Sequence, residues 1–127
     1  MLAGFEPLIL SSGTPSITVT RNGVSFNKSV VEKMEKSEYV QLFVDRTGRR
    51  FAISVCDSSL PTARRFYRGR DISNGIRWNN QDLLDTLSEL SGIRATTGFK
   101  VKGEYIPEDR ALIFDLNKTE PVRSAGN

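Results

Sequence analysis

A five-residue pattern occurs twice in this chain and constrains its fold more than any other feature. The first copy reads Gly23-Val24-Ser25-Phe26-Asn27, and the second reads Gly75-Ile76-Arg77-Trp78-Asn79. Each copy has a glycine, an apolar residue, a polar residue, an aromatic residue and an asparagine, followed by apolar residues at helical spacing. One residue is inserted before the second helical stretch. The pattern predicts two similar half-domains in tandem.

Short strands are predicted around both copies. Alternation of apolar and polar residues indicates strands at residues 16–20, 24–26, 39–44 and 51–55 in the first half, and at 99–102 and 111–116 in the second. Arg21-Asn22-Gly23 predicts a hairpin turn, because Asn and Gly tolerate positive φ. Residues 103–110 are predicted to form a loop.

A short amphipathic helix follows each copy. The first helix begins at Asn27 or at Ser29, since either side chain can accept a hydrogen bond from an N-terminal amide. It would bury Val30, Val31 and Met34. The second helix begins at Asn79 or Asn80 and ends at Gly92, a favourable C-terminal residue. Its apolar stripe is Leu83, Leu84, Leu87 and Leu90.

These elements predict an α+β fold made of two β-α-β-β half-domains that share one small barrel or sheet core. The half-repeats cover residues of about 16–56 and 73–116, and residues 57–74 join them. A chain of 127 residues favours one domain, spanning 1–127. Residues 117–127 contain Pro, Ser and Gly and have almost no apolar content, which predicts a flexible tail.

Arginine is concentrated in and around the joint between the halves, residues 57–74. Residues 46–77 contain eight arginines, no lysine and only two acids, Asp57 and Asp71. The densest run, residues 64–70, interleaves arginines with Phe66 and Tyr67. Guanidinium groups bind phosphate in bidentate fashion and stack on flat rings, so the run predicts a phosphate-contacting loop.

The alternative is a solvated connector whose arginines pair with neighbouring acids. Asp82, Asp85 and Glu89 share one face of the second helix and could supply those acids. On this reading the joint docks on the acidic helix until nucleic acid competes for it. Trp78 is expected to pack in the core as Phe26 does, with base stacking as the alternative.

Little in the chain points to catalysis. It has no histidine, which removes the commonest general base and metal ligand, and no phosphate-binding P-loop motif. Cys56 is expected to be a packed thiol whose pKa is raised by the adjacent Asp57. We therefore expect a non-enzymatic protein with no cofactor and no metal site. A single cysteine, the absence of basic residues before Arg21 and the lack of a long apolar stretch predict a cytoplasmic location without a membrane partner.

Residues 16–56, and more loosely 73–116, resemble the AbrB/MazE swapped-hairpin family. The resemblance rests on the strand, Gly-containing turn and strand of residues 17–27, the short helix, and the strands at 39–44 and 51–55. Members of this family are usually homodimers whose two units interlock into one barrel. They act as bacterial transcription regulators or as the DNA-binding part of antitoxins. The resemblance implies that this chain is a fused pseudo-dimer, monomeric or paired again as a homodimer.

The resemblance implies binding of double-stranded DNA and, for an antitoxin, of a toxin protein. The family has a basic residue after the turn glycine and a proline opening the helix, where this chain has Val24 and Asn27, then Ile76 and Asn79. The DNA-binding role is therefore assigned mainly to the joint. The candidate contacts are Arg21, Arg64, Arg65, Arg68, Arg70 and Arg77. The alternatives are a protein-interaction adaptor and a protein that binds a small anionic ligand.

Overall fold

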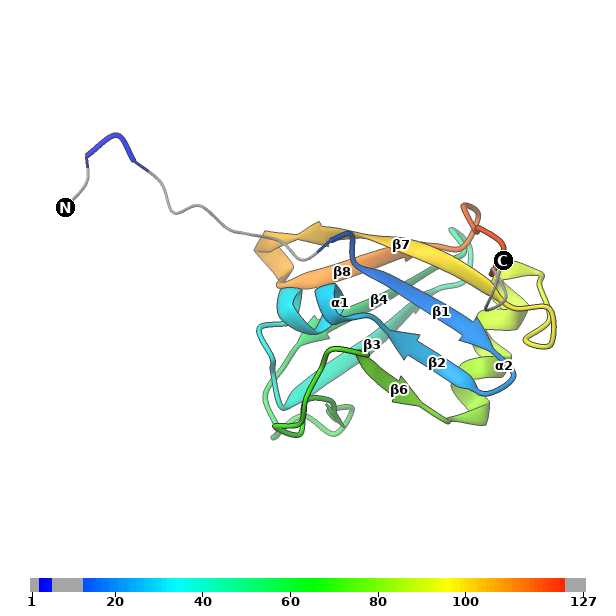
Figure 1. The fold of residues 1–127 in the computed structure, drawn as a ribbon, viewed down its shortest axis with the longest axis horizontal. Coiled ribbons are helices and arrows are strands. Elements are labelled where there is room, and N and C mark those ends of the chain that lie inside the picture. The colour runs from blue at the N-terminus through cyan, green and yellow to red at the C-terminus, as the bar shows by residue number, and fades with distance from the viewer. Residues whose placement is uncertain (1–2, 6–12, 123–127) are drawn as a thin grey trace.

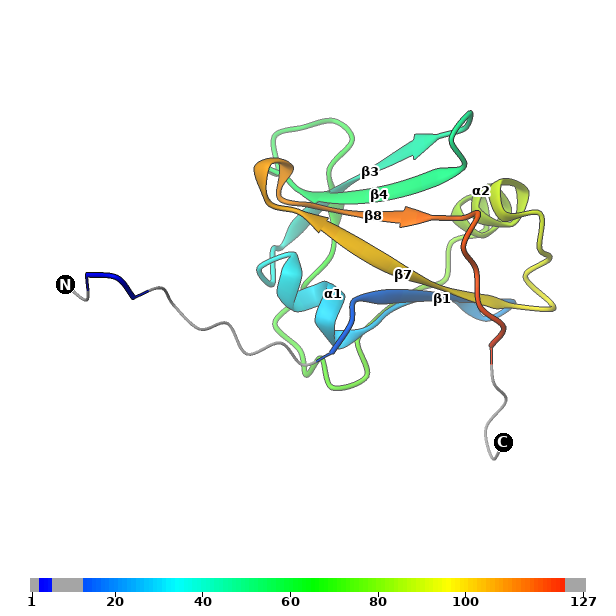
Figure 2. The same ribbon diagram turned by 90° about the horizontal axis from the view of Figure 1, so that it is seen from above.

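The strands of this computed structural model, which describes residues 3–5 and 13–122, form one curled antiparallel sheet. The strands are β1 (Ser16–Thr20), β2 (Gly23–Phe26), β3 (Tyr39–Asp45), β4 (Arg50–Val55), β5 (Arg64–Arg65), β6 (Ile76–Trp78), β7 (Phe99–Ile106) and β8 (Ala111–Asp115). Their order in the sheet is β5-β3-β4-β8-β7-β1-β2-β6. The sheet bends into a half-barrel, and Figures 1 and 2 show it from two directions.

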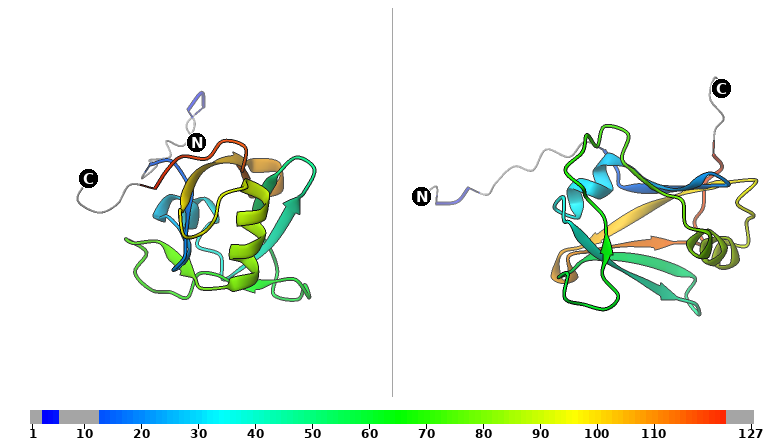
Figure 3. Two further views of the ribbon diagram at one scale, coloured as in Figure 1. Left: turned by 90° about the vertical axis from the view of Figure 1, so that its right-hand side faces the viewer. Right: turned by 90° about the horizontal axis from the view of Figure 1, so that it is seen from below.

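Two helices lie at opposite ends of the curled sheet, as Figure 3 shows. Helix α1 (Lys28–Lys33) follows β2, and α2 (Gln81–Ser91) follows β6. A 3-10 helix, η1 (Pro107–Asp109), joins β7 to β8. The helices bury their apolar stripes against the concave face of the sheet, where five fully buried phenylalanines fill the core: Phe26, Phe51, Phe66, Phe99 and Phe114.

The two copies of the repeated pattern pair with each other in the sheet. Strand β2 runs antiparallel to β6, with Ser25 opposite Arg77 at the centre of the pairing. Glycine is required at the start of each copy because the neighbouring strand is so close. A Cβ atom at Gly23 would lie 2.6 Å from the carbonyl oxygen of Trp78, and one at Gly75 would collide with the carbonyl oxygen of Phe26.

An asparagine side chain caps the helix that follows each copy. Asn27 caps α1 by accepting a hydrogen bond from the amide of Val30 at 3.1 Å. Asn80, and not Asn79, caps α2 through the amide of Leu83 at 3.0 Å. The inserted residue of the second copy is therefore Asn79, which lies between the strand and the cap.

The coarse prediction of an α+β chain is confirmed, as are both helices and the predicted strands. The arrangement as two half-domains stays a prediction. The predicted loop at 103–110 is wrong in its first part, because β7 continues to Ile106. Gly103 broke the apolar alternation there, yet its lack of a side chain makes room for the ring of Phe114, which a Cβ atom would approach to 2.7 Å.

The predicted tail at 117–127 divides into two parts. Residues 117–122 are described, and Glu120 forms a β-bridge with Lys100 through two backbone hydrogen bonds of 2.8 Å. This segment is therefore held against β7. Residues 123–127 lie outside the described part of the chain.

Candidate nucleic-acid interface

The joint between the repeats is fixed to the sheet by backbone hydrogen bonds. Strand β5 pairs with the start of β3, placing Arg65 opposite Tyr39. The ladder continues beyond β5, because the amide of Phe66 donates to the carbonyl of Glu38 at 2.7 Å and that of Tyr67 to Ser37 at 3.1 Å. The first part of the arginine run, residues 64–67, is thus held against β3 and the residues before it.

Phe66 anchors the middle of this run in the core. Its side chain is only 2 % exposed. Its ring meets Phe26 edge to face at a centroid distance of 5.4 Å and Trp78 at 5.7 Å, and Phe26 and Trp78 also meet at 5.0 Å. The three aromatic rings come from β2, the joint and β6, so they connect both copies of the repeat to the joint.

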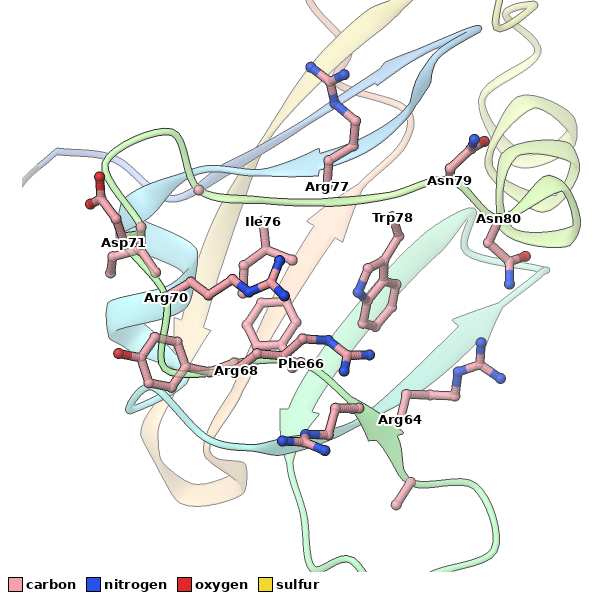
Figure 4. A pocket seen from close by; sticks show the side chains of 15 residues that line it. Arg64, Phe66, Arg68, Arg70, Asp71, Ile76, Arg77, Trp78, Asn79 and Asn80 are labelled. Carbon is pink, nitrogen blue, oxygen red and sulfur yellow. The ribbon is translucent and has the colours of Figure 1, made fainter.

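An open pocket of about 660 Å³ lies between the two ends of the sheet. Strand β5 and the following residues form one wall, and β6 forms the other, as Figure 4 shows. Its volume lies within the range of about 300–1,000 Å³ that ligand pockets occupy. We call it the basic pocket, since arginine dominates its lining. The arginines that line it are Arg64, Arg65, Arg68, Arg70 and Arg77.

Three of these arginines are available to a ligand. Arg64, Arg68 and Arg70 are exposed, and within the described residues their guanidinium groups form no hydrogen bond or ion pair. In Figure 4 the side chains of Arg68 and Arg70 extend toward Trp78, whereas Arg64 extends toward Asn80. Unpaired guanidinium groups around an aromatic ring are suited to an anionic, flat ligand.

The other predicted arginines have different surroundings. Arg65 pairs with Glu38 at 3.4 Å. The side chain of Arg77 lies on the opposite face of β6 from that of Trp78. Its Nε is 3.4 Å from the hydroxyl of Ser25. Arg21 lies in the β1–β2 turn and does not line the pocket. The structure thus brings together five of the six predicted residues and leaves Arg21 outside.

Acidic side chains contribute little to the pocket. Asp71 is the one acid lining it among the described residues, and its carboxylate accepts hydrogen bonds from the hydroxyl of Ser73 at 2.7 Å and from the amide of Ser73 at 3.0 Å. These bonds hold the pKa of Asp71 below its usual range. Asp71 therefore stabilises a turn and forms no ion pair with the arginines of the pocket among the described residues.

The acidic face of α2 does not pair with the joint, which was the alternative reading of the arginine run. Glu89 lies 3.9 Å from Arg46, in the β3–β4 turn, and Asp85 accepts a hydrogen bond from Gln81 at 2.8 Å. Within the described residues, no ion pair joins the arginines of the joint to α2.

The described residues contain no group of three or more His, Cys, Asp or Glu side chains placed to hold a metal ion. Burial raises the pKa of the Cys56 thiol, and the charge of Asp57 raises it further. No helix in the described ranges has the length and apolar character needed to span a bilayer.

Sequence reasoning missed one wall of the pocket. Trp78 was expected to be a core residue, and its ring does pack on Phe26 and Phe66, but it is half-buried and also lines the pocket with Ile76. Arg70, which precedes β6, and Arg77, which lies within it, were the available signal. Their relation to the run at 64–68 depends on the closure of the sheet.

Comparison with known proteins leaves the site to be interpreted from its own geometry. No protein-family model, curated protein or solved structure matches this chain. The resemblance to the AbrB/MazE family, with the duplex DNA and toxin partners that it implies, stays a prediction.

Proposed function

We propose that this protein is a non-enzymatic nucleic-acid-binding protein that holds phosphate groups in the basic pocket. The observation that carries the proposal is the position of Arg64, Arg68 and Arg70. They lie around one opening, and none of them pairs with an acid of the described chain. Arginine forks match phosphate oxygens, and neutralising phosphates releases counterions, which favours binding.

The location of the arginines supports the proposal. Arg64 belongs to β5, and Arg68 comes two residues after the buried Phe66, so the positions of these two arginines are partly set before a ligand arrives. Pre-organisation lowers the entropic cost of binding. We infer that the function is regulatory or architectural in kind.

A salt titration tests the proposal directly. We would measure binding of a labelled oligonucleotide by fluorescence anisotropy at several salt concentrations. The slope of log K against log salt reports the number of phosphates contacted. Replacing Arg64, Arg68 and Arg70 together by Ala should weaken binding at least tenfold and reduce that slope by about 2 to 3.

A matched control separates the pocket from net charge. Replacing Arg46, Arg94 and Lys118 by Ala removes the same three charges from residues outside the pocket. This control should retain nearly all of the affinity and the salt slope. If both triple variants weaken binding equally, the charges act through the overall field and the pocket is not the site. A chain with no affinity for nucleic acid at low salt would overturn the proposal.

The single variant Arg21→Ala tests the resemblance to the AbrB/MazE family. Arg21 was expected to contact DNA from the first hairpin turn, but the basic pocket does not include it. If binding occurs through the pocket, Arg21→Ala should leave the affinity for nucleic acid unchanged, whereas Arg68→Ala should lower it. The opposite result would place the interface at the β1–β2 turn.

A further inference from the structure

The basic pocket continues into a second hollow, which is lined in part by apolar side chains. This hollow has a volume of about 470 Å³ and lies between β3, β4 and α2. Its apolar lining comes from Leu42, Val44, Phe51 and Leu83. Arg64 and Trp78 line both spaces, so the two hollows form one groove with the indole ring at their junction. We refer to the second space as the apolar hollow.

The two parts of the groove differ in charge. The basic pocket is lined by five arginines and one aspartate. The apolar hollow is lined by one arginine, Arg64, and one acid, Asp82. Phosphate is therefore favoured only in the first part. The second part is suited to a flat, weakly polar group, and the carboxylate of Asp82 could accept a hydrogen bond from an amino group on its edge.

Trp78 has one polar atom available in this groove. Its indole N–H donates to no acceptor in the described residues, and no buried side-chain nitrogen or oxygen there lacks a partner. The N–H must therefore be in contact with solvent. An aromatic side chain that is packed on one side and open on the other is the usual platform on which an unpaired base stacks.

A duplex would use only part of this groove. Its bases are paired and stacked inside the helix, so it would offer phosphates to the arginines and leave Trp78 and the apolar hollow empty. Asp82, an exposed acid of α2, also lines the groove. Its carboxylate would repel the phosphates of a second strand laid across the opening.

We propose that the groove binds an unpaired nucleic-acid strand, with its phosphates on Arg64, Arg68 and Arg70 and a base stacked on Trp78. The next base along the strand occupies the apolar hollow. This inference rests on the proposed function and specifies its ligand as single-stranded DNA or RNA.

The fluorescence of Trp78 provides the test, because this is the only tryptophan in the chain. We would titrate the protein with a single-stranded oligonucleotide, its duplex, and a single strand of the same length that lacks bases. The single strand should quench Trp78 and bind about tenfold or more tightly than the duplex and the abasic strand, because stacking contributes about 1–3 kcal/mol per base.

The outcomes separate this inference from the proposed function. If all three ligands bind equally and the Arg64, Arg68 and Arg70 variant abolishes binding, the protein binds nucleic acid but the unpaired-strand inference is overturned. If none of the three ligands binds, both proposals fail. The abasic comparison uses the unmodified protein, so it does not depend on the folding of any variant.

Two substitutions at Trp78 refine the result. Trp78→Phe keeps an aromatic ring and should retain most of the preference for the single strand over the abasic strand. Trp78→Leu should reduce that preference to near unity while the affinity for the abasic strand stays the same, measured by anisotropy. Equal preferences in the two variants would show that the ring does not stack on a base.

Discussion

The rings of Phe66 and Trp78 meet edge to face with their centroids 5.7 Å apart. Phe66 belongs to the arginine-rich joint and Trp78 to the second copy of the repeat, so this contact connects the two walls of the basic pocket. The stability of the fold and the shape of the site are therefore coupled at one pair of side chains.

Phe66→Ala should destabilise the protein by about 3–5 kcal/mol, because it removes a fully buried aromatic side chain and leaves a cavity. The emission of Trp78 should also shift to longer wavelength as water reaches the ring. Denaturant unfolding followed by fluorescence measures both effects. Phe43→Ala is the control, since Phe43 is 46 % exposed, and it should change stability by less than about 1 kcal/mol.

Gly75→Ala should be more destabilising than Gly69→Ala. The two glycines have nearly the same backbone conformation, with φ of +72° and +77°. A Cβ atom at Gly69 has no neighbour within 4 Å, whereas one at Gly75 collides with the carbonyl of Phe26. The conformational penalty is shared, so the collision should add about 1–3 kcal/mol at Gly75. Equal thermal unfolding of the two variants would contradict the close pairing of β2 and β6.

The three asparagines after the repeated strands should differ in their effect when replaced by Ala. Asn27 caps α1, accepts a second hydrogen bond from the amide of Ser16 at 3.1 Å, and donates to the carbonyl of Thr14 at 2.9 Å. The side chain of Asn80 makes only its cap bond among the described residues. We expect a loss of about 2 kcal/mol or more for Asn27→Ala and about 1 kcal/mol for Asn80→Ala. The free energy of unfolding of Asn79→Ala should lie within about 0.5 kcal/mol of that of the parent. A larger loss would indicate that Asn79, and not Asn80, caps α2.

The ion pair between Glu35 and Arg110 should make stability depend on pH. The Arg110 Nε donates to Glu35 at 2.8 Å, and this contact lowers the pKa of the Glu35 carboxyl. A carboxyl whose pKa is lowered on folding contributes stability above its unfolded pKa, and that contribution is lost as pH falls through the folded pKa. The difference in melting temperature between the parent and Glu35→Gln should therefore shrink from pH 7 to about pH 3.

The control for this ion pair is Glu108→Gln, which removes an exposed carboxyl without an ion-pair partner in the described chain. At pH 7, Glu108→Gln should lower the melting temperature of the protein by less than Glu35→Gln does. A constant difference for Glu35→Gln across the whole pH range would show that the loss arises from packing and not from charge.

Local patterns predicted most of the elements but not how the sheet closes. The hairpin at Asn22-Gly23, the caps and the leucine stripe of α2 depend on nearby residues, so the sequence indicates them. Strand β5 has two residues and no alternation, because Arg64 and Arg65 are both exposed. The basic pocket requires β5 and β6 to face each other from opposite ends of the sheet, and no short-range pattern encodes that relation.

The unclosed side of the half-barrel has a consequence for how such a chain can evolve. The hydrogen-bonded ladder has two ends, at β5 and β6, and the joint crosses between them. Residues 68–74 belong to no strand or helix, and all of them except the buried Ile72 are exposed, so these exposed side chains can be exchanged without breaking the ladder. A descendant of this protein could therefore acquire a different ligand through changes at the exposed positions alone, with Phe66, Ile72 and Trp78 retained in the core.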